Sequence, residues 1–273
     1  MHNEIMRPSH LHLHPDPSRT IIRPFLVEDP PAFAVEGQPR ARRIAARVDS
    51  LDREAVGHAL ERALASLAQR HRDVEALLLR RFDEVRGLLA DGDAPGRAQK
   101  LLIGAYFSEE YSFESAALFN PSMVLHPDQE NVPPGGVRFL LSLRGIGEGH
   151  VSSVTFRTGI WTADGGFHVD PPSRIAVPPR IEQIADGDGT TRLQCAGSHD
   201  ISETVFFPMT PSQRQGIEDV RLVRFTGEDG AVRYLGTYTA YDGRDARSEL
   251  LDCLDFRAFA MQTLSGEAAT SKG

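Results

Sequence analysis

The residues best suited to chemistry lie in one short stretch, which has the sequence GIEDVRLVR over residues 216–224. Glu218 and Asp219 stand at the start of an apolar run, and Arg221 follows two positions later. Alternate side chains of a strand point to the same face, so we expect Asp219 and Arg221 to lie side by side. A carboxylate beside a guanidinium is normally ionised and held in place. The pair is therefore either a structural ion pair or one half of an acid–base site.

Two further polar segments could supply partners for this pair. Asn120 precedes a proline in the segment FNPS, which restricts it to extended conformations and fixes the direction of its amide. The alternative is a turn at the start of a strand. Arg144 ends the apolar run RFLLSLR and faces the glycine-rich loop GIGEGH, whose backbone can approach a ligand closely. Glu148, in the same loop, is the natural base for activating water in a hydrolytic reaction, and otherwise an ordinary loop charge.

Several motifs resemble glycoside hydrolase family 130, the β-mannoside phosphorylases and related β-mannosidases. GIEDVRLVRF and the later YLGTYTAYDG resemble the Glu-Asp-Pro-Arg signature of this family and the Tyr-Thr-Ala strand that follows it. FNPSMVLHPDQ and RFLLSLRGIGEGHVSSVTFRTG resemble the first propeller blade of a longer branch of the family, and the ending SGEAATSKG resembles a later segment. The matches follow one another in order over residues 101–273, which makes the resemblance more specific than any single motif.

The resemblance implies a reaction and a role for each matching residue. The reaction is inverting phosphorolysis of β-mannosides, in which Asp219 acts as the acid through a sugar hydroxyl and inorganic phosphate attacks from the opposite face. Phosphate is already a nucleophile, so the reaction needs no carboxylate base and no other cofactor. Tyr238 or Tyr241 could stack on a sugar ring, although either could instead belong to the core. The substrate-binding candidates are Asn120, Ser122, Arg144, Arg221 and Tyr241, and the phosphate-binding candidate is Lys272.

The sequence also departs from the family pattern. Val220 replaces the usual proline of the signature, which removes no functional group, and Ser271 replaces an asparagine. The phosphate-binding histidines and arginines of the family would lie beyond residue 273. We therefore expect residues 1–273 alone to be weakly active or inactive. The alternatives are a β-mannoside hydrolase of the same family with Glu148 as the base, and a truncated, non-catalytic propeller fragment.

The composition argues against several classes of partner. The 273 residues carry 30 basic and 38 acidic side chains, a net charge of −8, and the pI is near 5.7. An acidic surface disfavours nucleic acid and anionic membranes as partners, but is compatible with a small neutral oligosaccharide. Cys195 and Cys253 form neither a disulfide framework nor a zinc motif, so we expect two free thiols. Since the sequence lacks a membrane-length apolar run and the apolar core of a signal peptide, we expect a cytoplasmic location.

Residues 1–48 are expected to form a tail and an arm. A strand is predicted at 20–27 and a proline-rich loop at 30–43. Three histidines in the tail could share one face of a strand, but no cysteine or acidic cluster accompanies them. We therefore expect a flexible tail rather than a metal site at His10, His12 and His14.

Residues 49–100 are expected to form a helical section. Apolar side chains recur there at helical spacing over residues 51–67 and again over 74–89. The resulting apolar stripe either packs against the rest of the chain or forms the seam of a homo-oligomer. Beyond this section, Glu109, Glu110 and Glu114 are expected on a solvated helix face.

Residues 101–273 are predicted to be mainly β and to form part of a propeller. Pattern alone allows a propeller, a sandwich or a barrel, and the family resemblance indicates a five-bladed propeller. Since a blade needs four strands, the strand-like runs amount to about two blades. These runs alternate with turns rich in Gly, Pro and Asp and lie at 118–125, 137–143, 150–158, 202–207, 218–226, 232–240 and 248–253, with weaker ones near Phe167 and Leu193.

Overall fold

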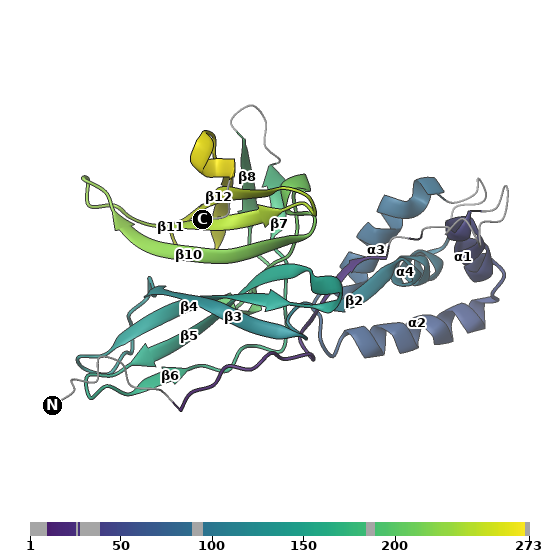
Figure 1. Ribbon diagram of the computed structural model, residues 1–273. Coiled ribbons are helices and arrows are strands. Elements are labelled where there is room, and N and C mark those ends of the chain that lie inside the picture. The colour runs from purple at the N-terminus through teal and green to yellow at the C-terminus, as the bar shows by residue number, and fades with distance from the viewer. Residues whose placement is uncertain (1–9, 26, 28–38, 89–94, 184–188, 271–273) are drawn as a thin grey trace. The chain divides into compact units, whose positions relative to one another are not determined.

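The computed structural model describes residues 10–25, 27, 39–88, 95–183 and 189–270 (Figure 1). The protein is mainly β, with four α-helices and one large mixed sheet among these residues. It divides into two compact units, a helical unit of residues 20–111 and a β-rich unit of residues 1–19 and 112–273. This division falls later than the boundary at residue 100 that the sequence suggested.

The helical unit confirms the expected helices within residues 50–90, where the described residues contain no strand. Asp52 begins the second helix by accepting a hydrogen bond from the backbone N–H of Ala55. The helices α3 (Val74–Val85) and α4 (Arg97–Tyr106) approach so closely that Gly104 lies against the backbone of Leu78, with no room for a Cβ atom. The helices are α1 (Arg40–Asp49), α2 (Arg53–Leu67), α3 (Val74–Val85), the 3-10 turn η1 (Arg86–Leu88) and α4 (Arg97–Tyr106).

Two segments of this unit differ from the sequence-based expectation. Residues 40–43 were predicted to lie in the proline-rich loop, but they form the first turn of α1, because Pro39 stands where the helix begins. Residues 101–106 were predicted to lead into the propeller, but they belong to α4. Leu102 and Ile103 are buried in the same apolar cluster as Phe82, so the helical unit holds them through its own core.

A two-stranded ribbon joins β1 (Thr20–Pro24) to β2 (Ser108–Ser112). The predicted strand at 20–27 is thus confirmed over its first five residues. The expectation of a solvated helix face for the neighbouring acids is wrong. Glu109 and Glu110 lie on β2, where each is paired with a basic side chain, and Glu114 is completely buried. Local composition failed here because the bases that neutralise these acids are distant in sequence.

The β-rich unit contains one mixed sheet of eleven strands. Its first half is an antiparallel meander of β3 (Ala117–Leu125), β4 (Val137–Ile146), β5 (Ser152–Trp161) and β6 (Phe167–Val169). A second antiparallel meander follows, formed by β10 (Gly216–Thr226), β11 (Val232–Tyr241), β12 (Ala246–Cys253) and β13 (Ala258–Thr263). The short β9 (Val205–Phe206) pairs with β5, and β8 (Thr190–Gln194) and β7 (Arg180–Gln183) extend the sheet beyond β13.

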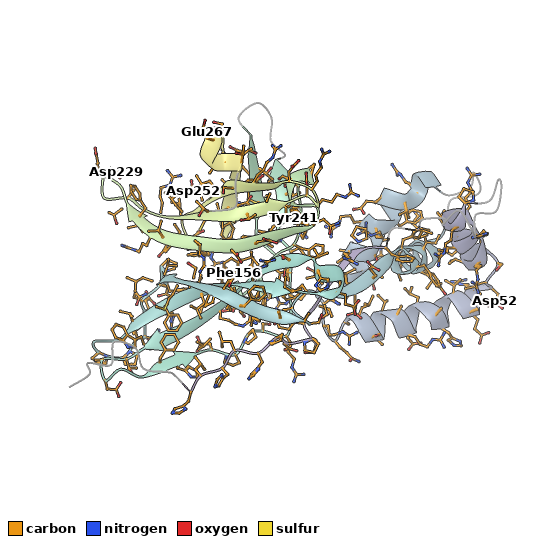
Figure 2. The ribbon with its side chains drawn as sticks, in the orientation of Figure 1. Asp52, Phe156, Asp229, Tyr241, Asp252 and Glu267 are labelled. Carbon is orange, nitrogen blue, oxygen red and sulfur yellow. The ribbon has the colours of Figure 1, made fainter. Side chains whose placement is uncertain are left out.

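The two meanders meet through a single parallel pair, Gly216 with Ser152. Figure 1 shows them as two layers of the β-rich unit. The main core lies between these layers, because its buried cluster takes Leu140 and Phe156 from the first meander and Val220 and Tyr238 from the second. Phe156 is labelled in Figure 2 and packs edge-on against Phe206 of β9. Side chains of both layers therefore exclude water from one shared core.

The expected strands are confirmed in type, and three were missed, namely β2, described above, and two strands of the large sheet. Every predicted run overlaps a strand, including the weak ones near Phe167 and Leu193. The runs at 180–183 and 258–263 were not predicted, because each is short and carries a charged or small residue among its apolar ones. The eleven described strands of the β-rich unit form one open sheet, with no closed ring among them.

No helix among the described residues is both long and apolar enough to cross a membrane. The rings of His12 and His14 lie 6.2 Å apart in a segment without strand pairing. The described residues contain no group of three or more His, Cys, Asp or Glu side chains that could hold a metal ion.

Candidate functional site

Two matching irregularities shape the candidate site. The pairing of β3 with β4 shifts register between Phe119 and Ser122, and the pairing of β10 with β11 shifts between Glu218 and Arg221. Asn120 (φ +52°) and Asp219 (φ +53°), inside these shifts, have left-handed backbones. Asn and Asp tolerate this region better than other non-glycine residues. A bulge of this kind turns a side chain away from its regular direction.

The two bulges face each other, although β3 and β10 are not neighbours in the sheet. The amide Nδ2 of Asn120 donates a hydrogen bond of 2.6 Å to Oδ1 of Asp219. On either side of this bond, Ser122 Oγ accepts from the backbone N–H of Leu222 at 2.9 Å, and Arg221 donates to the carbonyl of Pro121 at 2.9 Å. Three bonds therefore tie one bulge to the other.

Arg144 brings a positive charge to the same point from the end of β4. Its Nε donates to Ser152 Oγ at 3.0 Å, and one terminal nitrogen lies 2.7 Å from Oε1 of Glu218. The other terminal nitrogen lies 3.5 Å from Oδ1 of Asp219. The side chains of Arg144, Glu218 and Asp219 are 15%, 11% and 24% exposed. Partial burial weakens solvent screening, so these charges interact more strongly than a surface pair would.

The carboxylate of Asp219 is held on one side only. Within the described residues, both of its polar side-chain contacts, from Asn120 and Arg144, fall on Oδ1. Its second oxygen, Oδ2, is left to bind or release a proton. A partly exposed carboxyl with one anchored oxygen and one open oxygen can act as a general acid or base.

The geometry corrects two local predictions. Asp219 and Arg221 do not form an ion pair in the described structure, because the bulge breaks the alternation that would place them on one face. The guanidinium beside Asp219 is that of Arg144. Asn120 is not extended, since its φ lies in the left-handed region despite the following proline. Its amide direction is nevertheless fixed, by the bond to Asp219.

The structure gathers some of the predicted site residues and leaves others apart. It brings together Asn120, Arg144 and Asp219, and it places Ser122 and Arg221 on the bonds that flank them. Their roles toward a substrate stay predictions. One residue of the cluster was not assigned a role from the sequence, namely Glu218, the partner of Arg144. Regular alternation would have pointed Glu218 away from Asp219, so only the bulge reveals that both face Arg144.

Two other candidates, Glu148 and Tyr241, lie outside this cluster. Glu148 is exposed in the 3-10 turn η2 (Glu148–His150) between β4 and β5. Tyr241, labelled in Figure 2, is half-buried at the end of β11, opposite Gly216. Lys272 lies outside the described residues. Tyr238 was the other tyrosine that could stack on a sugar ring. The structure favours a core role for it, because it is buried and its hydroxyl donates to Glu249 at 2.6 Å.

Other features of the described part of this unit lie apart from the cluster. Two surface hollows of about 510 and 420 Å³ are lined by other residues, the first by apolar side chains around Trp161 and the second by groups around His126 and Asp255. Cys195 and Cys253 are both buried and free, as expected. Burial raises the pKa of the Cys195 thiol to about 11 and that of Cys253 to about 12, which leaves both uncharged at neutral pH.

Comparison with known proteins gives partial structural likenesses. No family model matches the sequence, and no curated protein matches it. One similar solved structure is from the GH130 family of mannoside phosphorylases, which contains glycoside hydrolases that target β-1,2 mannosidic linkages in Candida mannan, with 16% identity and a TM-score of 0.32. Another is a glycosyl hydrolase from Bacteroides ovatus, with 18% identity and a TM-score of 0.30. The matches cover 59% and 55% of this chain, but only 36% and 32% of those chains.

Proposed function

We propose that the chain is part of a carbohydrate-active enzyme that cleaves β-mannosides by inverting phosphorolysis, with Asp219 as the general acid. The observation that carries the proposal is the anchoring of Asp219 Oδ1 by Asn120 and Arg144, which leaves Oδ2 open. The order of motifs along the sequence supports the same assignment, since the segments that resemble family 130 supply all three residues.

The proposed reaction is balanced without a base from the protein. Asp219 gives its proton through a sugar hydroxyl to the glycosidic oxygen while the bond from the anomeric carbon to that oxygen breaks. A phosphate oxygen forms a new bond to the anomeric carbon from the opposite face, which gives α-mannose 1-phosphate and a free sugar. The ionised Asp219 is then stabilised by the N–H of Asn120 and the charge of Arg144.

The neighbouring side chains have groups that suit a sugar. Ser122 accepts a hydrogen bond from the backbone of β10, so its hydroxyl hydrogen is available to donate. Arg144 is fixed at both Ser152 and Glu218, so it holds one orientation as a substrate binds. Fixed donors that meet charge as it develops are the usual source of electrostatic catalysis.

We propose further that the two meanders are neighbouring blades of a five-bladed propeller. The strands β3–β4–β5–β6 and β10–β11–β12–β13 are each an antiparallel meander of four, which is the content of one blade. The bulges that face each other lie on the first strand of each meander. First strands line the channel of a propeller, so this arrangement would place the site at the channel.

The test is an assay on a β-mannobiose with and without inorganic phosphate. It compares the full product of the gene, residues 1–273 alone, and each with Asp219→Asn. We expect phosphate-dependent release of mannose 1-phosphate by the full product and little or none by residues 1–273. Asp219→Asn should lower kcat by about 10²–10⁴-fold with little change in KM, because an acid acts chiefly in the transition state.

A matched control is Asp128→Asn, which alters an exposed turn carboxylate that accepts from the backbone of Glu130. It should keep full turnover. Release of free mannose without phosphate would instead favour the hydrolase, and Glu148→Gln should then abolish it. If Asp219→Asn keeps full turnover, Asp219 is not the acid, and if the wild-type protein cleaves no β-mannoside, the proposed function is wrong.

A further inference from the structure

We infer that Asn120 is a positioning residue for Asp219, which determines the carboxyl oxygen that carries the transferable proton. The sequence had suggested a sugar contact for Asn120. The structure instead places its amide nitrogen 2.6 Å from Oδ1 of Asp219. This inference rests on the proposed role of Asp219 as an acid, and concerns a residue that acts through it.

The hydrogen-bond chemistry assigns the two oxygens different roles. An ionised carboxylate only accepts, so the nitrogen of the Asn120 amide, and not its oxygen, faces Oδ1. The second donor near Asp219, Arg144, lies 3.5 Å from the same oxygen. A protonated carboxyl oxygen is a donor and a poor acceptor, so the proton of the neutral acid belongs on Oδ2. No polar contact from the described part of the chain occupies Oδ2, so this oxygen is the one free to donate a proton.

The backbone explains why an asparagine suits this position. Its φ of +52° is accessible to Asn, Asp and Gly, but strained for most other residues. Among these three, only Asn has an amide that can donate to a carboxylate. The flanking bonds from Leu222 to Ser122 and from Arg221 to Pro121 keep the two bulges in register. The distance from Asn120 to Asp219 is therefore set by two braced strands rather than by one flexible side chain.

Among the described residues, few charged side chains act on the carboxylate of Asp219 besides the amide of Asn120. Arg144 on β4 and Glu218 on β10 are the charged side chains that share the cluster, and Arg221 is directed to the carbonyl of Pro121. From β11, the residue opposite Glu218 is the neutral Thr239. Removing the amide of Asn120 therefore leaves Arg144 as the remaining donor near Oδ1, at the longer distance.

The test compares wild type with Asn120→Gly, which removes the amide but accepts the left-handed backbone. We expect kcat to fall by about 10–100-fold because the acid is less well placed, with KM changed by less than about twofold. The alkaline limb of the pH–rate profile should move to higher pH, because the ionised carboxylate loses a donor and holds its proton longer. The control is Asn131→Gly, since Asn131 also has a left-handed backbone (φ +57°) but lies in an exposed turn. It should change none of these quantities.

A second readout does not depend on activity. Carbon-13 NMR of aspartate carboxyl groups in residues 1–273, with Asp219 assigned through Asp219→Asn, follows its titration directly. The midpoint should lie at higher pH in Asn120→Gly than in wild type, and higher still in Asn120→Asp, because two carboxyls at this distance cannot both ionise easily. Asn120→Asp keeps the shape and the backbone preference, so it serves if Asn120→Gly does not fold.

Each outcome decides one question. A rise in KM with unchanged kcat and unchanged alkaline limb would show that Asn120 contacts the sugar and would overturn the inference. An unchanged NMR midpoint in both variants would overturn it as well. If the wild-type protein cleaves no β-mannoside, the proposed function fails, while the NMR titration still decides whether Asn120 controls the proton of Asp219.

Discussion

The β-rich unit contains two clusters of arginine and carboxylate that have opposite designs. In the first, Glu114 is completely buried between Arg19 and Arg157, whose side chains are 0% and 3% exposed. In the second, Asp219 is 24% exposed beside Arg144 and Asn120. Both clusters join residues that are far apart in sequence.

The clusters differ in how the carboxylate oxygens are used. Oε1 of Glu114 accepts from Arg19 at 3.0 Å and from Arg157 at 2.9 Å, and Oε2 accepts from Arg157 at 3.1 Å. Arg19 also donates to the carbonyls of Ser173 and Ser202. Every oxygen of Glu114 is thus used inside the protein, whereas Asp219 keeps one oxygen open. A satisfied buried network holds a fold together, and an open oxygen on an anchored carboxyl is suited to chemistry.

The largest expected effect is on stability, at the enclosed cluster. Glu114→Gln leaves two buried guanidinium groups without a counter-charge, so the free energy of unfolding should fall by about 3–5 kcal/mol. Urea unfolding followed by the fluorescence of Trp161, the sole tryptophan, measures this unit. The control Glu130→Gln, at an exposed loop position, should change stability by less than about 0.5 kcal/mol. A loss below about 1 kcal/mol for Glu114→Gln would contradict the structural role of the cluster around Glu114.

A smaller loss is expected at the open cluster. Glu218→Gln removes the 2.7 Å ion pair with Arg144, but Arg144 keeps Ser152 and the nearby Asp219. The cluster is partly exposed, so the free energy of unfolding should fall by about 1–2 kcal/mol. The same urea unfolding measures it. If Glu218→Gln costs as much as Glu114→Gln, the two clusters are equally structural and the distinction between them fails.

The helical unit offers a third cluster, which titrates. Hydrogen bonds from Arg70 lower the pKa of Glu110 to about 2, burial opposes this shift, and His71 adds to it. A carboxyl with a lowered pKa contributes its stability fully above the ordinary value of 4.5, and loses it as the pH falls toward about 2.

The helical unit should therefore lose stability over that acidic range. The contribution is below about 1 kcal/mol because the side chain is partly exposed and screened. Thermal unfolding followed by helical circular dichroism at a series of pH values tests this. In Glu110→Gln, the melting temperature should depend less on pH between the ordinary value of 4.5 and about 2. An unchanged pH dependence in Glu110→Gln would show that other carboxylates cause the acid sensitivity.

The smallest effect on stability is expected at the candidate acid itself. Asn tolerates the left-handed backbone of residue 219 and can still accept from Asn120, so Asp219→Asn should change the free energy of unfolding by less than about 0.5 kcal/mol. The large effect of this variant belongs to turnover. If urea unfolding shows a loss like that of Glu114→Gln, the carboxylate of Asp219 is structural.

Much of the fold follows from local pattern. The helical spacing of apolar residues within 50–90 predicts helices, and these helices are present. The alternating runs after residue 118 predict strands, and strands lie there. Such signals succeed because they depend on which side chains share one face of a single element. The strands at 180–183 and 258–263 were not predicted from the sequence, because a short run carries too few positions to show a period.

The candidate site was predicted in part, for a similar reason. Asn120, Arg144 and Asp219 each stand near the end of an apolar run, and the family resemblance pointed to all three. The pairing of Asp219 with Arg221 was wrong because the alternation rule assumes a regular strand. A bulge depends on the partner strand, so the sequence of β10 alone does not reveal it.

The sequence by itself determined the charge of this protein, the type of most of its elements and the residues that can take a left-handed backbone. Asn and Asp at positions 120 and 219 are compatible with φ near +50° because their short polar side chains tolerate it. Only the tertiary structure decided which carboxylates are enclosed and which is open. Arg19 lies 95 residues from Glu114, and Asn120 lies 99 residues from Asp219. Local sequence does not encode such pairings, because they arise when separate strands pack against one core and bring their charges together.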